Sequence, residues 1–260
     1  MVALTAICAK IITPIFSLKH PEAFQIAASL PIPQPSSLVG ALAYCIGTEQ
    51  RMGLRVQEII KDIAVVARGK LVGETAVVNP VILRRFRILD KGIEEGDFEE
   101  ACEALRLGDF NVFRNTLEKR LTDALYREYL SPAKLKCTWI LRTALESKIL
   151  YLLQRLGDTE SLVSVTEAWS ADCKMMSINE LSTDYPFTLD GNMIDNIQGN
   201  YTVLKMCDEK RDLKLFYVPC KKEVRSTPTG VKYFVYTPTR IDLKLKKPCT
   251  VFIVDGDFIL

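Results

Sequence analysis

The spacing of apolar residues along the chain separates predicted strands from predicted helices. Residues 2–12 are apolar at nearly every position, which predicts a short strand covered on both faces. A loop of residues 13–34 follows, and the next apolar residues recur at intervals of three and four, as on the buried face of a helix: Leu38, Ala41, Leu42 and Cys45. We expect this helix to end at Gly47 and a second strand to cover residues 63–67.

A similar order returns later in the chain. Residues 134–141 alternate between apolar and polar side chains, which predicts a strand. Thr143 and Glu146 form a capping-box pattern, so we expect a helix from there to Gly157, followed by a strand at residues 162–169. Strand, helix, strand, then again strand, helix, strand is the order of a ferredoxin-like split β-α-β unit.

Two further regions differ in pattern. The charge-rich residues 90–130 predict two amphipathic helices separated near Gly108 and are interpreted as an insertion. From Lys174 onward only short strands are expected, with residues 177–199 as a loop; they are residues 202–206, 213–218, 232–236, 241–245 and 250–254.

The predicted fold class is therefore α+β. An N-terminal ferredoxin-like (RRM-like) domain, residues 1–172, carries a helical or thumb-like insertion at about residues 70–131. A small β-rich C-terminal domain covers residues 173–260.

Composition narrows the function only slightly. A net charge of +2 and a pI near 8.0 do not mark a nucleic-acid binder, so such a function must depend on local clusters. The 8 cysteines are scattered without a CxxC pair, which favours buried thiols in a reducing compartment over a zinc site or disulfides. No secretory leader pattern is present, and we expect a cytoplasmic protein without cofactor or metal.

The stretch from Leu30 to Gly47 has two interpretations. Pro31, Pro33 and Pro35 favour an extended approach to the helix, and Ser36 or Ser37 is the expected N-cap. Gly40 inside the helix indicates close approach of another backbone or of a ligand. A tightly packed core helix is the interpretation that the residues favour, and an anion site at the helix start is the alternative.

Other candidate residues are basic. Arg84, Arg85 and Arg87 surround Phe86, a pattern that suits phosphate binding with base stacking and equally suits a solvated strand edge. His20 beside Lys19 favours a phosphate or backbone contact, with acid/base cleavage of RNA as the alternative. We interpret the two remaining basic clusters as ordinary polar faces: Lys221, Lys222 and Arg225, and Lys244, Lys246 and Lys247. No Walker loop, GxGxxG, GxSxG or HExxH motif is present.

Two segments carry a family resemblance. Pro-x-Pro-x-Pro-Ser-Ser-Leu-x-Gly-Ala-Leu at residues 31–42, after a strand and a loop, resembles the signature of the fifth Cas family. This family of the RAMP superfamily supplies the CRISPR-associated Cascade subunit that caps the 5′ handle of the guide RNA (crRNA). Residues 156–162 are similar to a segment of its archaeal type I-A branch. The order of elements agrees over roughly the first 170 residues.

The resemblance implies an RNA-binding protein of antiviral defence that has a ferredoxin-like domain with a thumb. Its expected partners are the crRNA 5′ handle, the repeated Cascade backbone subunit and the large subunit. The expected RNA contacts are Lys19, His20, Gln25, Ser36, Ser37, Gly40, Arg84, Arg85 and Arg87.

One branch of the family cleaves precursor crRNA with Tyr, Lys and His side chains. His20 is the sole member of such a set that the sequence places, so we expect binding without catalysis. A metal-independent endoribonuclease that uses His20, and a protein-only scaffold subunit without RNA contact, remain the alternatives.

Overall fold

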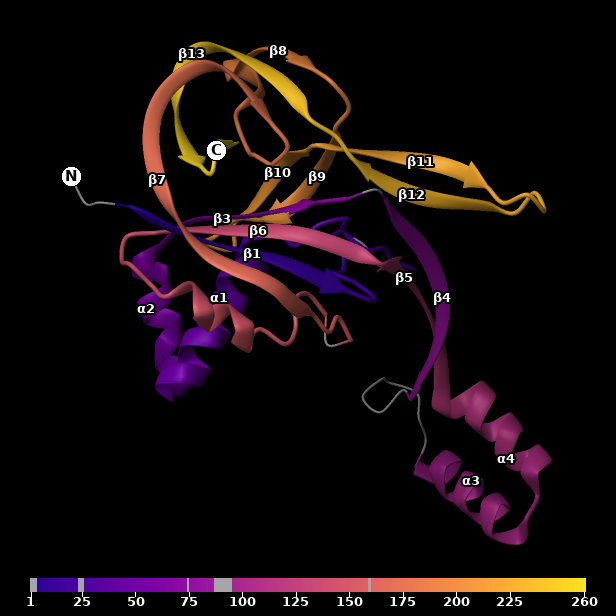
Figure 1. The fold of residues 1–260 in the computed structure, drawn as a ribbon. Coiled ribbons are helices and arrows are strands. Elements are labelled where there is room, and N and C mark those ends of the chain that lie inside the picture. The colour runs from indigo at the N-terminus through magenta and orange to yellow at the C-terminus, as the bar shows by residue number, and fades with distance from the viewer. Residues whose placement is uncertain (1–3, 23–25, 74, 87–94, 159) are drawn as a thin grey trace. The chain divides into compact units, whose positions relative to one another are not determined.

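The computed structural model describes residues 4–22, 26–73, 75–86, 95–158 and 160–260, and confirms the α+β class (Figure 1). The chain forms two compact units. The first comprises Met1–Ala23, Ala28–Asn79 and Tyr129–Leu260, and the second Phe24–Ala27 and Pro80–Glu128. In the described residues no helix is long and apolar enough to cross a membrane.

The sheet of the first unit is built on four strands: β1 (Thr5–Thr13), β3 (Ala64–Leu71), β6 (Ala133–Leu141) and β7 (Ser164–Thr183). They lie in the order β7-β1-β6-β3, and all neighbouring pairs are antiparallel. This is the strand order of a split β-α-β unit. The strands predicted at residues 2–12 and 134–141 are confirmed.

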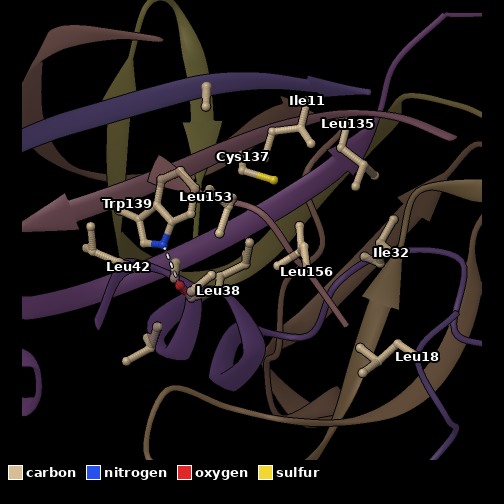
Figure 2. Close-up of a cluster of buried hydrophobic side chains, with 14 of the residues drawn as sticks. Ile11, Leu18, Ile32, Leu38, Leu42, Leu135, Cys137, Trp139, Leu153 and Leu156 are labelled. Atoms are coloured by element: carbon tan, nitrogen blue, oxygen red, sulfur yellow. Dashed lines mark hydrogen bonds between the residues drawn. The ribbon is translucent and has the colours of Figure 1, made fainter. Parts of the chain in front are cut away.

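One face of this sheet is covered by α1 (Pro35–Gln50), η1 (Gly53–Arg55) and α2 (Val56–Ile63). Figure 2 shows Trp139 of β6 in this core beside Leu38 and Leu42 of α1, with its indole N–H donating to the Leu38 carbonyl at 2.9 Å. The helix does not end at Gly47. It continues to Gln50, and Arg51 supplies the left-handed end at φ 54°, with its N–H donating to the Gly47 carbonyl.

The helix expected between Thr143 and Gly157 is wrong. A short 3₁₀ segment, η3 (Ser147–Leu152), stands there instead. Ile149 and Leu150 of this segment are buried, whereas Leu152 is 37% exposed, and the following backbone is used for other hydrogen bonds. Leu156 N–H donates to the Ser161 carbonyl at 3.1 Å and Val163 N–H to the Gln154 carbonyl at 3.0 Å, so this stretch turns back on itself and is not helical.

Strand β7 continues beyond the first sheet partner. Its residues up to Asp172 pair with β1, and those from Cys173 pair with β13 (Ile241–Val254). Strands β8 (Ile194–Gln198), preceded by η4 (Gly191–Met193), and β14 (Asp257–Ile259) also pair with β13. The prediction of a loop over residues 177–199 is therefore wrong at both ends. The two strands predicted at 241–245 and 250–254 are one strand with a register shift between Lys244 and Cys249.

Two hairpins complete the first unit. Strands β9 (Thr202–Cys207) and β10 (Leu213–Val218) form the first, close to the predicted ranges. Strands β11 (Cys220–Ser226) and β12 (Lys232–Pro238) form the second, and β12 also pairs with the start of β4 (Ala76–Phe86). The sequence did not predict β11 because its charged residues hide the alternation.

The second unit is largely helical. Strand β4 leads into it, and β5 (Thr122–Ser131), which pairs with the short parallel strand β2 (Ile26–Ala27), leads out. Between them are α3 (Glu95–Leu107), α4 (Phe110–Thr116) and the π-helical turn η2 (Leu117–Leu121). The two helices separated near Gly108 are confirmed, with Gly108 at φ 74°. Helical structure beyond Leu121 is wrong, since β5 begins at Thr122.

Candidate nucleic-acid interface

The loop between β1 and α1 is held in place by backbone hydrogen bonds, within itself and to Leu130 of β5. Phe16 exchanges two hydrogen bonds of 2.8 Å with Leu130, and Leu30 N–H donates to the Leu18 carbonyl at 2.8 Å. His20 N–H donates to the Ala28 carbonyl at 2.9 Å. The two arms of the loop thus run side by side, and hydrogen bonds between them hold the part that carries Lys19 and His20.

The segment Leu156–Leu162, one of the two that carried the resemblance, fastens this loop. The buried Ser161 hydroxyl accepts from Ser17 N–H at 2.9 Å and donates to the Ser17 carbonyl at 3.0 Å. Asp158 N–H also donates to that carbonyl, at 2.9 Å. At Gly157 the backbone has φ 104°, and a Cβ there would lie 2.7 Å from the Ser17 oxygen, so a side chain does not fit. The motif therefore has a structural role.

The proline run is also structural. Pro31, Pro33 and Pro35 are buried, and Pro33 lies against Gly69 of β3, where a Cβ would come within 2.8 Å of its ring. Close packing of the run on the sheet explains why glycine stands at position 69. The favoured interpretation of a packed core segment is correct for this part of the stretch.

Helix α1 begins two or three residues earlier than an N-cap at Ser36 or Ser37 predicts. Gln34 is its N-cap residue and Pro35 its first residue, and no side chain caps the helix. The Gln34 side-chain oxygen instead accepts from Cys207 N–H of β9 at 3.1 Å. The prediction of Ser36 or Ser37 as N-cap is wrong, because proline at the first helical position fixes the start before them.

The helix start offers little to an anion. A helix leaves four N–H groups without partners at its N-terminus, but Pro35 has none and Ser37 N–H donates to the Gln34 carbonyl at 3.0 Å. Ser36 and Ser37 are half-buried. A phosphate bound here would therefore depend on their hydroxyls more than on the helix backbone.

Gly40 lies on the exposed face of α1. Nothing in the described chain comes within 4 Å of the position of its missing Cβ. The prediction that another backbone approaches Gly40 is therefore wrong within the described part of this chain. Tyr44, one turn later, is 47% exposed and its hydroxyl donates to Gln154 at 3.4 Å. The predicted approach of a ligand stays a prediction.

Lys19 and His20 are the basic residues at the tip of the loop. Lys19 is exposed and pairs through its backbone with Ser29. The His20 Nδ1 accepts from Glu22 N–H at 3.2 Å, so one ring nitrogen stabilises the turn and Nε2 faces away from that bond. Glu22 is ion-paired with Lys205 of β9, which ties the tip to the β9–β10 hairpin.

Four predicted contacts, Gln25, Arg84, Arg85 and Arg87, stay predictions. Arg84 and Arg85 belong to β4 in the second unit, and their side chains lie outside what the structure describes. Gln25 and Arg87 lie outside the described residues. Within the described ranges no group of three or more His, Cys, Asp or Glu is arranged to hold a metal ion.

Sequence reasoning missed a network of charges on the sheet face opposite α1. Lys70 contacts both carboxylate oxygens of Asp184, at 2.7 and 2.8 Å, and reaches Asp257 at 3.1 Å. Lys136 lies 2.9 Å from the same Asp257 oxygen. Arg68, also buried, is ion-paired with Glu209 and donates to the Leu260 carbonyl at 3.0 Å. The signal in the sequence that could have found this network is a lysine or arginine within an otherwise apolar strand.

The network is electrostatically satisfied. Burial alone would raise the pKa of Asp257, but the ammonium groups of Lys136 and Lys70 outweigh it and hold that pKa below its ordinary value. Burial alone would lower the pKa of Lys136, and Asp257 keeps it above its ordinary value. The basic side chains of this sheet face are therefore neutralised by carboxylates from the C-terminal part of the chain.

Comparison with known proteins shows a similarity in sequence to a CRISPR-associated protein. No family model matches the chain. It is 27% identical over 219 residues to the CRISPR-associated protein Cas5 of Thermoproteus tenax, a match that covers 81% of this chain and 83% of that protein. The chain is similar in sequence to Cas5. The Cas5 match is longer than the roughly 170 residues that carried the resemblance, so it reaches into the C-terminal part.

One solved structure of a CRISPR protein shares the fold of this chain. The crystal structure of a CRISPR protein from Archaeoglobus fulgidus matches with a TM-score of 0.57, covering 98% of each chain at 13% identity. A chain of a CRISPR RNA-guided surveillance complex matches with a TM-score of 0.38 at 13% identity, covering 90% of this chain and 91% of that one. At this identity the first likeness shows the shared architecture alone.

Proposed function

We propose that this chain is a non-catalytic subunit of a type I CRISPR surveillance complex (Cascade) that binds the 5′ handle of the crRNA in antiviral defence. The observation that carries the proposal is the sequence similarity to Cas5 over 81% of the chain. The proposed partners are the crRNA, the repeated backbone subunit and the large subunit.

The geometry favours RNA binding at the loop over binding on the sheet. The sheet face opposite α1 is occupied by the ion pairs of Lys70 and Lys136, so it cannot serve as a base-stacking platform. Lys19 is exposed and His20 half-exposed; His20 N–H donates to the Ala28 carbonyl, and Ser17, two residues before Lys19, donates its N–H to the Ser161 hydroxyl. A fixed cationic tip loses little conformational entropy when it binds a phosphate.

Binding without cleavage is part of the proposal. The His20 Nδ1 already accepts a backbone hydrogen bond from Glu22, which is a turn-stabilising role. RNA cleavage through the 2′-hydroxyl needs a positioned base and a positioned acid. We therefore expect repeat RNA to stay intact when it is incubated with the purified chain in EDTA. Handle-specific products that disappear in His20→Ala would overturn this part of the proposal.

Lys19→Ala tests the RNA contact. Losing one phosphate contact on a single strand lowers the slope of log affinity against log salt concentration by about 0.7. We expect that decrease for crRNA with an intact handle, measured by fluorescence anisotropy over a salt series. Lys10→Ala is the matched control, because Lys10 is an exposed lysine already paired with Glu167 at 2.8 Å. Equal slopes for wild type and both variants would favour the scaffold alternative.

A further inference from the structure

The β11–β12 hairpin forms a two-stranded ribbon whose outer part has no other strand beside it in the described chain. Its register pairs Cys220 with Pro238 and Ser226 with Lys232, and β4 pairs only with Phe234, Val235 and Tyr236 (Figure 1). The turn at its end is well ordered by hydrogen bonds. Thr227 N–H donates to the Val231 carbonyl, and Gly230 N–H to the Thr227 carbonyl, each at 2.9 Å.

The register divides the ribbon into two faces of different chemistry. Alternate residues of a strand point to opposite sides, and residues in register share a side. One side, here called the aromatic face, consists of Lys222, Val224, Lys232, Phe234 and Tyr236 with Cys220, Ser226 and Pro238. The other, here called the ion-paired face, consists of Lys221, Glu223, Arg225, Tyr233, Val235 and Thr237.

The aromatic face presents an exposed ring with cations and no acidic residue. Val224 is 56% exposed, and its partner in register, Phe234, is 47% exposed. The Lys222 ammonium lies 4.9 Å from the centre of the Phe234 ring and 5.6 Å from that of Tyr236. Tyr236 is buried in the core, so it anchors the base of the face while Phe234 stays open.

The ion-paired face is neutralised internally. Glu223 lies 2.7 Å from the Lys221 ammonium and 3.7 Å from the Arg225 guanidinium. The hydrogen bond from Lys221 holds the pKa of Glu223 below its ordinary value, so the carboxylate stays charged. The single acidic residue of the ribbon thus serves two of its basic residues on one side and leaves the other side positive.

We propose that the aromatic face of the β11–β12 ribbon is an RNA-binding surface, on which a nucleobase of single-stranded RNA stacks against Phe234 while Lys222 and Lys232 contact its phosphates. The inference rests on the proposed function only in that the strand is the RNA held by this subunit. It assigns a contact far along the sequence from the loop and from the arginines of β4.

Charge and composition favour RNA over a protein partner. An aromatic ring flanked by lysines is how proteins bind single-stranded nucleic acid, because every base has a face that stacks and every nucleotide has a phosphate. A protein-docking patch would need more apolar surface than Val224 and Phe234 offer, and protein interfaces are poor in lysine. The ordered turn and the anchored Tyr236 keep the ring in place before binding.

Three substitutions at one position separate stacking from other effects. The full-length chain is titrated by fluorescence anisotropy into crRNA with an intact 5′ handle and into an RNA with a scrambled handle. We expect Phe234→Ala to weaken binding of both RNAs about tenfold, Phe234→Leu to weaken it nearly as much, and Phe234→Trp to bind like wild type. Tyr233→Ala, on the ion-paired face, is the matched control and changes affinity less than about twofold. Thermal unfolding midpoints verify that each variant folds.

Each outcome has a defined meaning. Phe234→Ala within about twofold of wild type would overturn the ribbon proposal, and if the preference for the intact handle persists, the proposed function stands. Tight RNA binding by Phe234→Leu would show an apolar docking contact and overturn stacking. If wild type binds both RNAs equally well and Phe234→Ala binds both weakly, handle recognition is overturned and the ribbon proposal is supported. Absence of any RNA binding would overturn both.

Discussion

A lysine above an aromatic ring occurs in two regions of the first unit, and the surroundings of these pairs differ. On the covered sheet face, Lys70 lies 4.3 Å from the centre of the Tyr185 ring and Lys136 lies 5.5 Å from a Trp169 ring centre. On the ribbon, Lys222 lies 4.9 Å from the Phe234 ring centre. The sheet lysines are completed by Asp184 and Asp257, whereas the aromatic face of the ribbon has no carboxylate.

The difference shows why net charge says little about RNA binding here. The chain has nearly equal numbers of basic and acidic residues, 34 and 32. Several of the carboxylates are bound to lysines and arginines inside the first unit, so they do not reduce the charge of the exposed ribbon. A cation above a ring attracts an anion: the fold supplies it on the sheet, and RNA phosphate would supply it on the ribbon.

Asp257→Asn is expected to have the largest effect. It leaves Lys70 and Lys136 largely buried, with Asp184 still beside Lys70 and the weaker attraction of Asp255 for Lys136. Breaking such a pair costs about 2 to 3 kcal/mol of unfolding free energy, reduced from the fully buried case because the Asp257 carboxylate is 18% exposed. Urea denaturation measures the loss. An unchanged midpoint would mean that the network contributes nothing to folding.

The pH dependence of stability should follow the same carboxylate. The pKa of Asp257 in the folded chain is below its ordinary 3.8, so its contribution is fully present above 3.8 and is lost as pH falls through the lower folded value. We expect the unfolding free energy of wild type to decrease more steeply than that of Asp257→Asn as pH falls below 3.8. Parallel curves for the two proteins would contradict the assignment.

Glu223→Gln should have the smallest effect and the opposite sign for RNA. Because Glu223 is only partly buried and its partners Lys221 and Arg225 are exposed, its removal leaves the urea midpoint unchanged. It releases two cations, so we expect RNA affinity to rise about twofold, with a steeper salt dependence. The anisotropy assay used for Phe234 measures this change, and a decrease in affinity would show that Glu223 orders the ribbon for binding.

The sequence predicted those elements whose pattern of apolar residues is set by packing against a single neighbouring element. Strand β6 alternates because one face meets α1, and β10 appears at residues 213–218 as expected. The segment after Thr143 failed because its helical apolar spacing competes with backbone pairing of Gln154 and Leu156 to residues 161–163. Such long-range hydrogen bonds leave no local signal.

The candidate site was predicted less well than the fold. The loop with Lys19 and His20 was found because it is long and lies between a predicted strand and a predicted helix. The ribbon was passed over because Lys221, Lys222 and Arg225 look alike in sequence, and only the register shows that Glu223 neutralises one face and not the other. The role of Ser161 as the support of Ser17 depends on residues 144 positions apart.

The course of strand β7 has a consequence for any truncated form of the chain. It changes partner from β1 to β13 between Asp172 and Cys173, where composition predicts a domain boundary. A fragment that stops there would lack Asp184, Glu209 and Asp257 while keeping Arg68, Lys70 and Lys136. The fragment would display bare cations on a sheet with exposed apolar neighbours. Its adsorption to any polyanion would then be an artefact of truncation, easily mistaken for guide-RNA recognition.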